Sequence, residues 1–331
     1  MSWRRGGAVA LALVFILAMA ALVLDAGGAP DLEPVVQRLE ERGRPPLDVV
    51  VQAGRAAEVV LLSDVHGLPG PKRLAAEAVR ALAEGPGLDA VVLAVPSGEQ
   101  PYIDAYLTAG QEDATLLLNR PGAVREAFGA SREFLEIYRA VWQANAELGA
   151  ARQIRVIAAD HPDWPPPQGA SSTEAAALFA GRTEHMLQRM DEELLARIPD
   201  ARLLVFVDGY MTLQRTHGEV RFAGGDPVRV DWLGETMRQR AGGAGVRTVL
   251  VDAGSGASTG HALPSYHGTS FHRSLRRELN GDVAVRTSNH FAVLADPILE
   301  ASSPSVRLDI LPDGVTMRDL ADAYVFMESG R

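Results

Sequence analysis

Five apolar runs of this 331-residue chain end on an aspartate. A carboxylate can hold a cation or take a proton from water, so five of them at comparable positions are candidates for shared chemistry. Short runs rich in Val, Ile and Leu are typical of strands buried on both faces of a parallel sheet, and ligands bind at the carboxyl ends of such strands. Aspartate is also a common turn former and helix N-cap, which is the structural alternative. The runs are Val59–Asp64, Ile154–Asp160, Leu203–Asp208, Arg247–Asp252 and Phe291–Asp296.

The first of these aspartates has a histidine two residues later. In an extended segment residues i and i+2 project to the same side, so Asp64 and His66 can face one target together. A carboxylate beside a neutral imidazole suits Zn²⁺, Mn²⁺ or Fe²⁺, and such an ion lowers the pKa of bound water to make a nucleophile. We therefore expect Asp64 and His66 to bind a divalent metal, with Asp64 as ligand or general base. Asp160 and Asp208 are expected to support the same catalytic site.

Other polar residues are candidates for substrate binding. Arg182 could clamp an anionic group with two hydrogen bonds, although a salt bridge to a strand-end carboxylate is an equal alternative. His161 directly follows Asp160, and His217 lies six residues after Met211. His185 is interpreted as a boundary residue of a long helix. Gln100 is a further candidate because of a family resemblance described below. The chain has no Gly-x-Ser-x-Gly motif, which argues against a serine hydrolase.

The remaining pattern predicts an α/β fold, with a mostly parallel central sheet flanked by helices. The run Ala90–Val95 is a further buried strand, and apolar residues at helical spacing predict the helices. Ser171 and Glu174 form a capping-box pattern at the start of the third helix. About 300 residues are enough for one large domain, which we place at 58–331. The predicted helices are 72–84, 131–149, 171–197 and one around Trp232 that ends at Gly242-Gly243, and 306–315 is a candidate terminal hairpin.

The N-terminal segment predicts export. Arg4 and Arg5 precede seventeen apolar residues, Ala8–Leu24, which approach the length needed to cross a bilayer. We expect residues 1–30 to form a signal anchor and 31–57 a juxtamembrane spacer with a short helix near Pro34–Glu41. The domain would then be extracytoplasmic on a single-pass membrane protein, or secreted if the segment is cleaved. The chain has no cysteine, which excludes disulfides, thiolate ligands and a lipoprotein anchor.

The net charge limits the choice of partners. At −10 the chain lacks the basic face that phosphate contacts require, so binding to nucleic acid is not expected. We expect a small-molecule or peptide substrate, and contact with the membrane only through the N-terminal helix. The sequence does not indicate an oligomeric state.

Several segments resemble the group that contains erythromycin-esterase-like proteins, ChaN-type haem-binding proteins and Tiki-type metalloproteases. Ser63-Asp64-Val65-His66 stands where that group has Gly-Glu-x-His, and the resemblance extends over roughly Val59–Asp296. Ala94 replaces the glutamate of the second strand and Met211 replaces a later histidine. The resemblance implies a divalent-metal hydrolase with a degenerate site, or a non-catalytic protein that binds haem or another small ligand. Further matching residues are Gln100, Asp104, Tyr106, Leu107, Arg182, Met186 and Val230–Gly234.

Two other interpretations are open. Leu61–Gly67 resembles the first motif of calcineurin-like metallophosphoesterases, but the further ligands that a two-metal site needs are missing in order. Ala90–Ser97 contains no Gly-Asp, and Gly260-His261 and Asn289-His290 come late in the chain. The anchor and the Pro-rich spacer would also suit a purely structural envelope protein.

Overall fold

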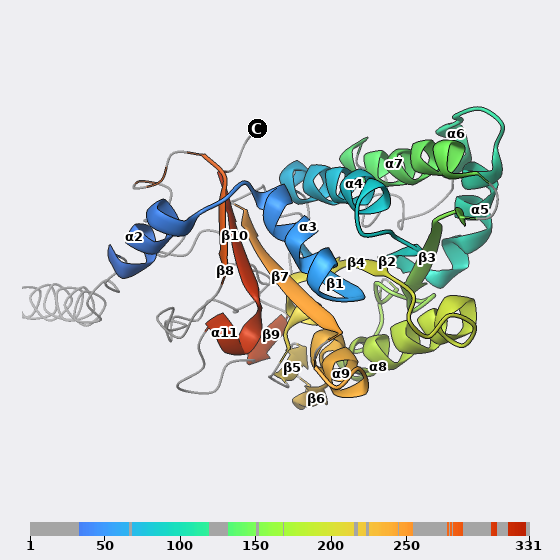
Figure 1. Ribbon diagram of the computed structural model, residues 1–331. Helices are drawn as coiled ribbons and strands as arrows, with labels where there is room; N and C mark the ends of the chain where they lie inside the picture. Colours follow the sequence, from blue (N-terminus) through green and yellow to red (C-terminus); the bar gives the residue numbers. More distant parts are fainter. Residues whose placement is uncertain are drawn as a thin grey trace, which may run out of the picture.

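The computed structural model contains a seven-stranded sheet with helices on both faces (Figure 1). The strand order is β3-β2-β4-β1-β7-β10-β8. The α/β fold class predicted from the sequence is therefore confirmed. The structure describes residues 33–65, 68–118, 132–149, 152–167, 169–214, 218–222, 225–243, 245–253, 277, 279, 281–286, 306–309 and 317–328.

The first six strands in this order run parallel, and β8 pairs antiparallel with β10. The apolar runs form these strands because both faces of the sheet are covered, so every side chain of a central strand needs an apolar environment. The burial of β1, β2 and β4 fits this, since nearly all of their residues are buried. The strands are β1 (Val59–Asp64), β2 (Ala90–Pro96), β3 (Arg155–Asp160), β4 (Leu203–Asp208), β7 (Val246–Ala253), β8 (Val283–Arg286) and β10 (Ala323–Met327).

Two apolar layers lie on opposite faces of the sheet. Alternate residues of β1 go to different layers, with Val60 and Leu62 in one and Leu61 in the other. The first layer contains α4 (Pro69–Glu84) and α7 (Arg132–Leu148), and the second contains α8 (Ser172–Met190) and α9 (Leu233–Arg240). Figure 1 shows these two helix pairs on either side of the sheet.

Short elements follow several strand ends. A 3₁₀ turn η1 (Ser97–Glu99) and helix α5 (Gln100–Thr108) follow β2, and η5 (Gly209–Thr212) follows β4. A π-helical turn, η4 (Asp191–Leu195), extends α8, and α6 (Thr115–Leu118) and α11 (Met317–Leu320) are single turns. The predicted helix 171–197 is therefore an α-helix with a π-helical end. Ser171 caps it with the predicted capping box.

A second, three-stranded sheet has the order β6-β5-β9 and is antiparallel. Its strands are β5 (Gly218–Phe222), β6 (Val228–Val230) and β9 (Val306–Asp309). The first strand of the predicted terminal hairpin, which begins at Val306, forms β9 and pairs with β5. Residues 310–316, the rest of that candidate hairpin, and the predicted strand Phe291–Asp296 lie outside the described residues.

The segment expected to be a spacer is helical and packed. It forms α2 (Glu33–Arg42) and α3 (Pro46–Ala56), and Val49 and Val50 of α3 are buried in the layer that contains α4. Leu39 of α2 is buried as well. The domain therefore begins before residue 58, because the apolar side of α3 covers part of the sheet.

The predicted anchor, Ala8–Leu24, lies outside the described residues. Within the part of the chain that the structure describes, no helix has the length and apolar character needed to span a bilayer.

Candidate functional site

The strand-end aspartates lie along one edge of the sheet. Asp64 of β1 is the register partner of Asp208 of β4, and Asp160 of β3 is the partner of Pro96 of β2. The carboxyl ends of β3, β2, β4 and β1 thus meet side by side, as the parallel arrangement predicts. Asp252 near the end of β7 accepts a hydrogen bond of 2.5 Å from the hydroxyl of Tyr324. The sequence prediction that strand-end carboxylates share an edge is therefore met for these four residues.

Arg182 joins two of these carboxylates. Its Nε donates to Asp160 Oδ1 at 2.9 Å, and its Nη2 donates to Asp160 Oδ2 at 2.6 Å and to Asp208 Oδ2 at 2.8 Å. Nη1 donates to the hydroxyl of Tyr210, which itself donates to Asp208 Oδ2 at 2.9 Å. The guanidinium is 0% exposed. It comes from α8, and it connects the ends of β3 and β4 across β2.

Aromatic rings enclose this guanidinium. Its carbon lies 4.4 Å from the centre of the Trp164 ring, with Phe179 at 5.7 Å and Tyr210 at 5.9 Å. Trp232 packs edge-on against Tyr210. Contact with an aromatic face favours a cation, so the rings add to the ion pairs.

Burial and charge act in opposite directions on Arg182. Burial lowers the pKa of Arg182, but Asp160, Tyr210 and Asp208 together raise the pKa well above its ordinary value. Burial also raises the pKa of Tyr210 well above its ordinary value, and the opposing effect of Arg182 does not cancel this. Arg182 therefore stays a cation and Tyr210 a neutral donor. The full burial of Arg182 means that a substrate arriving from solvent would not reach it without displacing these partners.

Asp64 pairs with a lysine, whereas Asp160 and Asp208 pair with Arg182. Lys72, in the first turns of α4, donates to Asp64 Oδ1 at 2.7 Å and to the carbonyl of Val65 at 2.8 Å. The Lys72 side chain is 5% exposed and the Asp64 side chain 10%. The lysine fixes the chain where it leaves β1, next to His66. His66 itself lies outside the described residues, as does His217.

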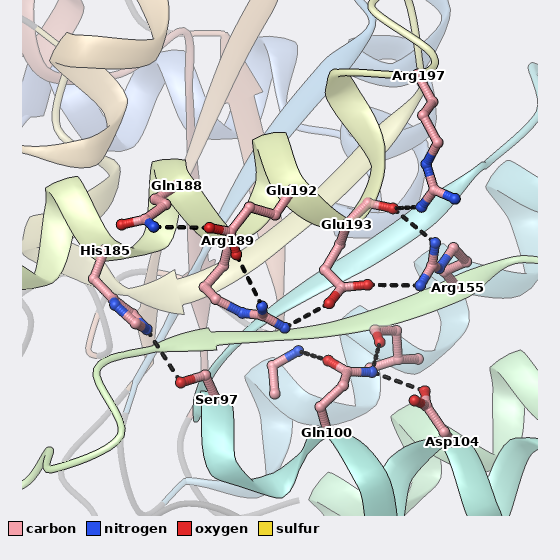
Figure 2. Close-up of polar contacts among 12 residues, drawn as sticks. Ser97, Gln100, Asp104, Arg155, His185, Gln188, Arg189, Glu192, Glu193 and Arg197 are labelled. Carbon is pink, nitrogen blue, oxygen red and sulfur yellow. Dashed lines mark hydrogen bonds and ion pairs between the residues drawn. The ribbon is translucent and has the colours of Figure 1, made fainter.

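A group of partly exposed side chains lies at the ends of β2 and β3. The Nε2 of His185 on α8 is 3.1 Å from the hydroxyl oxygen of Ser97, the first residue after β2 (Figure 2). The ring of His161 lies 5.1 Å from that of His185, centre to centre. Asp160 orients the start of this loop, because its Oδ1 accepts a hydrogen bond of 2.8 Å from the backbone N–H of His161. The buried Asp160 thus contacts both Arg182 and the backbone of the partly exposed His161.

Gln100 connects elements within the fold. Its side-chain amide donates to the carbonyl of Val156 at 2.8 Å and accepts from the N–H of Ala158 at 2.8 Å, and it also donates to Asp104 at 2.9 Å (Figure 2). The first two contacts replace ladder hydrogen bonds at the outer edge of β3. These contacts describe a structural link between α5 and β3, and Gln100 is largely buried.

The two residues that depart from the family pattern are both packed. Met211 is fully buried in the same apolar layer as Tyr210 and Trp232, and Ala94 is buried near the end of β2. Met211 therefore fills apolar volume at a place where the family resemblance would put a polar ligand.

The sequence did not single out Ser97, Lys72 or Tyr210, and it treated His185 as a boundary residue. One signal was present, since Arg182 and His185 are three residues apart and therefore lie on the same side of α8. A strand-end residue followed at once by a helix was a second signal for Ser97. Lys72 and Tyr210 became visible only when the packing of α4 and η5 placed them beside carboxylates.

Among the residues that the structure describes, no three His, Asp or Glu side chains are placed to share a metal ion. The strand-end carboxylates are instead paired with cations of the protein, because Lys72 binds Asp64 and Arg182 binds both Asp160 and Asp208. The described carboxylates do not form a metal site by themselves.

No family model and no curated protein matches the chain, but solved structures do. Erythromycin esterase EreC, as a histidine-to-asparagine mutant in its open conformation, has a TM-score of 0.56 and 11% identity over 87% of this chain and 97% of that one. A protein from Bacillus cereus has a TM-score of 0.59 and 10% identity over 90% of this chain and 97% of that one. A succinoglycan biosynthesis protein has a TM-score of 0.54 and 10% identity over the same shares. The expected resemblance to the erythromycin-esterase group is thus confirmed at the level of the fold.

Proposed function

We propose that this chain is a hydrolase that acts on a small-molecule or peptide substrate at the carboxyl edge of its sheet. The observation that carries the proposal is the register of β1 and β4, which sets Asp64 beside Asp208 at that edge. Arg182 links Asp208 to Asp160, so three strand-end carboxylates belong to one connected region. The likeness in fold to an esterase supports this choice of reaction class.

In this proposal His66 is the general base that activates water, and Asp64 orients it. The order Asp64-Val65-His66 allows both side chains to face the same side of an extended segment. Lys72 holds Asp64 with a charge-assisted hydrogen bond, which fixes the carboxylate for this role. Asp160 and Asp208 act at a distance from the substrate, by holding the loops after β3 and β4.

A divalent metal at Asp64 and His66 would have to compete with Lys72. The ammonium group already occupies Asp64 Oδ1 at 2.7 Å, and the described residues supply no further free set of ligands around it. We therefore derive no catalytic step through a metal. Haem binding gains no support from Met211, because that side chain is fully buried in the apolar layer.

We also propose that the enzyme works outside the cytoplasm and is tethered by its N-terminal segment. The support is the sequence pattern of Arg4, Arg5 and the seventeen apolar residues after them.

The full-length protein, purified in detergent, tests the hydrolase proposal with p-nitrophenyl butyrate as substrate. We expect His66→Ala, made in a Ser97→Ala background so that the hydroxyl beside His185 cannot contribute, to lower kcat/KM by about 10²-fold or more, the usual contribution of a general base. Asp64→Asn should lower it as well, because the amide loses the charge that Lys72 holds. Inductively coupled plasma analysis of the same samples measures bound metal and should find none in proportion to protein.

Asp231→Asn is the matched control. Asp231 follows β6 of the second sheet and carries an exposed carboxylate, 66% accessible. It should hydrolyse the ester at the rate of the unmodified protein. If His66→Ala and Asp231→Asn are indistinguishable, His66 is not the base and the proposal is wrong.

A further inference from the structure

We propose that Ser97 and His185 form a nucleophile and base pair that accepts an acyl group from a small carboxylic ester. The pair uses other residues than Asp64 and His66, and it does not rest on the function proposed above. Ser97 lies two strands away from Asp64 in the order β2-β4-β1, which is about 10 Å at the usual strand spacing. One edge of the sheet would thus hold two reactive groups.

The position of Ser97 is that of a residue presented by a strand-to-helix turn. It follows the last residue of β2 and begins the 3₁₀ turn that leads into α5. The sequence Pro96-Ser97-Gly98 lacks the Gly-x-Ser-x-Gly pattern, but the turn puts a hydroxyl at the same kind of place, the carboxyl end of a parallel strand. Gly98, the next residue, is exposed, so this turn lies at the surface of the protein.

The distance between the two groups suits proton transfer. Ser97 Oγ and His185 Nε2 are 3.1 Å apart, within the range in which a base activates a serine. Both side chains are partly exposed, so a substrate can approach them. His185 is held by α8, whose next turn toward the N-terminus carries the buried Arg182, and the base therefore has a rigid support.

His185 is in the form that a base needs. Burial first, and the neighbouring His161 second, lower the pKa of His185 below its ordinary value, so it is neutral at pH 7. Asp160 and Glu192 act in the opposite direction, and Arg189 acts with His161. A neutral ring can accept the proton of Ser97 at Nε2.

His161 is fixed as a hydrogen-bond donor. The backbone N–H of Asp163 donates to its Nδ1 at 3.2 Å, so a neutral His161 carries its proton on Nε2. The ring of His161 lies beside that of His185, at the accessible end of β3. Its Nε2–H can donate to the carbonyl oxygen of an ester as negative charge develops there.

The reaction balances with water as the only co-substrate. Ser97 Oγ attacks the ester carbonyl carbon while its proton passes to His185 Nε2. The bond from that carbon to the alcohol oxygen breaks, and His185 returns the proton to the leaving alcohol. Water then gives a proton to His185 and attacks the acyl carbon. The bond to Ser97 Oγ breaks, the acid is released, and Oγ takes the proton back.

The absence of cysteine makes a direct test available. Ser97→Cys puts a single thiol beside His185 in the full-length protein, and iodoacetamide reports its thiolate. If His185 takes the proton, alkylation at pH 6.5 should be at least 10-fold faster than for Ala177→Cys, an exposed control beyond the first turn of α8, where the helix N-terminus does not activate the thiol. His185→Gln added to Ser97→Cys should lower the rate to that of the control.

A second measurement covers the native hydroxyl. A fluorophosphonate probe should label the unmodified protein, with the adduct mapped by mass spectrometry to Ser97 and lost in Ser97→Ala. His66→Ala should keep both the fast alkylation in the Ser97→Cys background and the phosphonate adduct, which separates this pair from the water-activating site. A thiol at position 97 with the reactivity of that at position 177, or a phosphonate adduct at another residue, would overturn the proposal.

Discussion

Arg182 shows how one buried residue can organise an edge of the sheet. Its guanidinium binds Asp160, Asp208 and Tyr210 and is fully buried among aromatic rings. The desolvation of such a cation is costly, and it is offset only because two carboxylates and a ring system surround it. Asp160 in turn holds the backbone of His161. The buried ion pairs therefore position the partly exposed residue His161.

Arg182→Ala should destabilise the protein strongly. The substitution leaves Asp160 and Asp208 facing each other without their cation, so we expect a loss of roughly 3–5 kcal/mol in the free energy of unfolding. Chemical denaturation followed by circular dichroism measures this quantity.

Arg155→Ala is the control for charge alone. Arg155 also pairs with an acid, Glu193, at 2.7 Å, but its side chain is 39% exposed (Figure 2). Exposed pairs contribute little, so its loss should cost about 1 kcal/mol or less. Equal losses in the two variants would contradict a special role for the buried network.

Helix α8 is the element that connects the two parts of the edge. It begins with a capping box at Ser171 and Glu174 and carries Arg182 and His185 on one side. Arg182 points into the buried network and His185 reaches Ser97, one turn apart. The position of the candidate base therefore depends on how α8 packs against β3.

Two glycine substitutions test the packing of the helices on this face. A Cβ at Gly234, in the first turn of α9, would lie 2.2 Å from the carbonyl oxygen of Thr212 in η5, and backbone cannot move aside easily. Gly234→Ala should therefore lower the free energy of unfolding by roughly 1–3 kcal/mol. Gly181, inside α8, has nothing within 4 Å of such a Cβ.

Gly181→Ala should have the opposite sign and raise the free energy of unfolding by up to about 1 kcal/mol, because alanine is the better helix former. Thermal unfolding of both variants, followed by circular dichroism, gives the comparison. A neutral Gly234→Ala variant would mean that α9 and η5 do not approach as closely as the structure has it.

For the molecule as a whole, the sequence was most informative about the parallel sheet. The runs Val59–Asp64 and Leu203–Asp208 match β1 and β4 in both bounds, because a strand buried on both faces leaves an uninterrupted apolar run. β10 was not predicted, although its residues are equally buried. It is short, and its place between β7 and β8 follows from long-range pairing that no local pattern records.

The candidate site was predictable only in part, for the same physical reason. The end of a buried strand is visible in the local sequence as the end of an apolar run, so the sequence identified Asp64, Asp160 and Asp208 as strand-end residues. Contacts between residues that are distant in the sequence leave no local pattern, and Ser97 and His185 are 88 positions apart. The helical segment 33–56 was taken for a spacer because its Pro and charged residues hid the apolar side that α3 buries.

We propose that the substrate binds where β2, β3, β4 and β1 end, and the position of a bound substrate analogue tests this most directly. The measurement is a crystal structure of the full chain treated with an aryl phosphonate ester, an analogue of the tetrahedral intermediate. We predict density for the phosphonate at the carboxyl edge of the seven-stranded sheet, in contact with Ser97 or with the residues that follow Asp64. Density at the opposite edge, or on the β6-β5-β9 sheet, would contradict it.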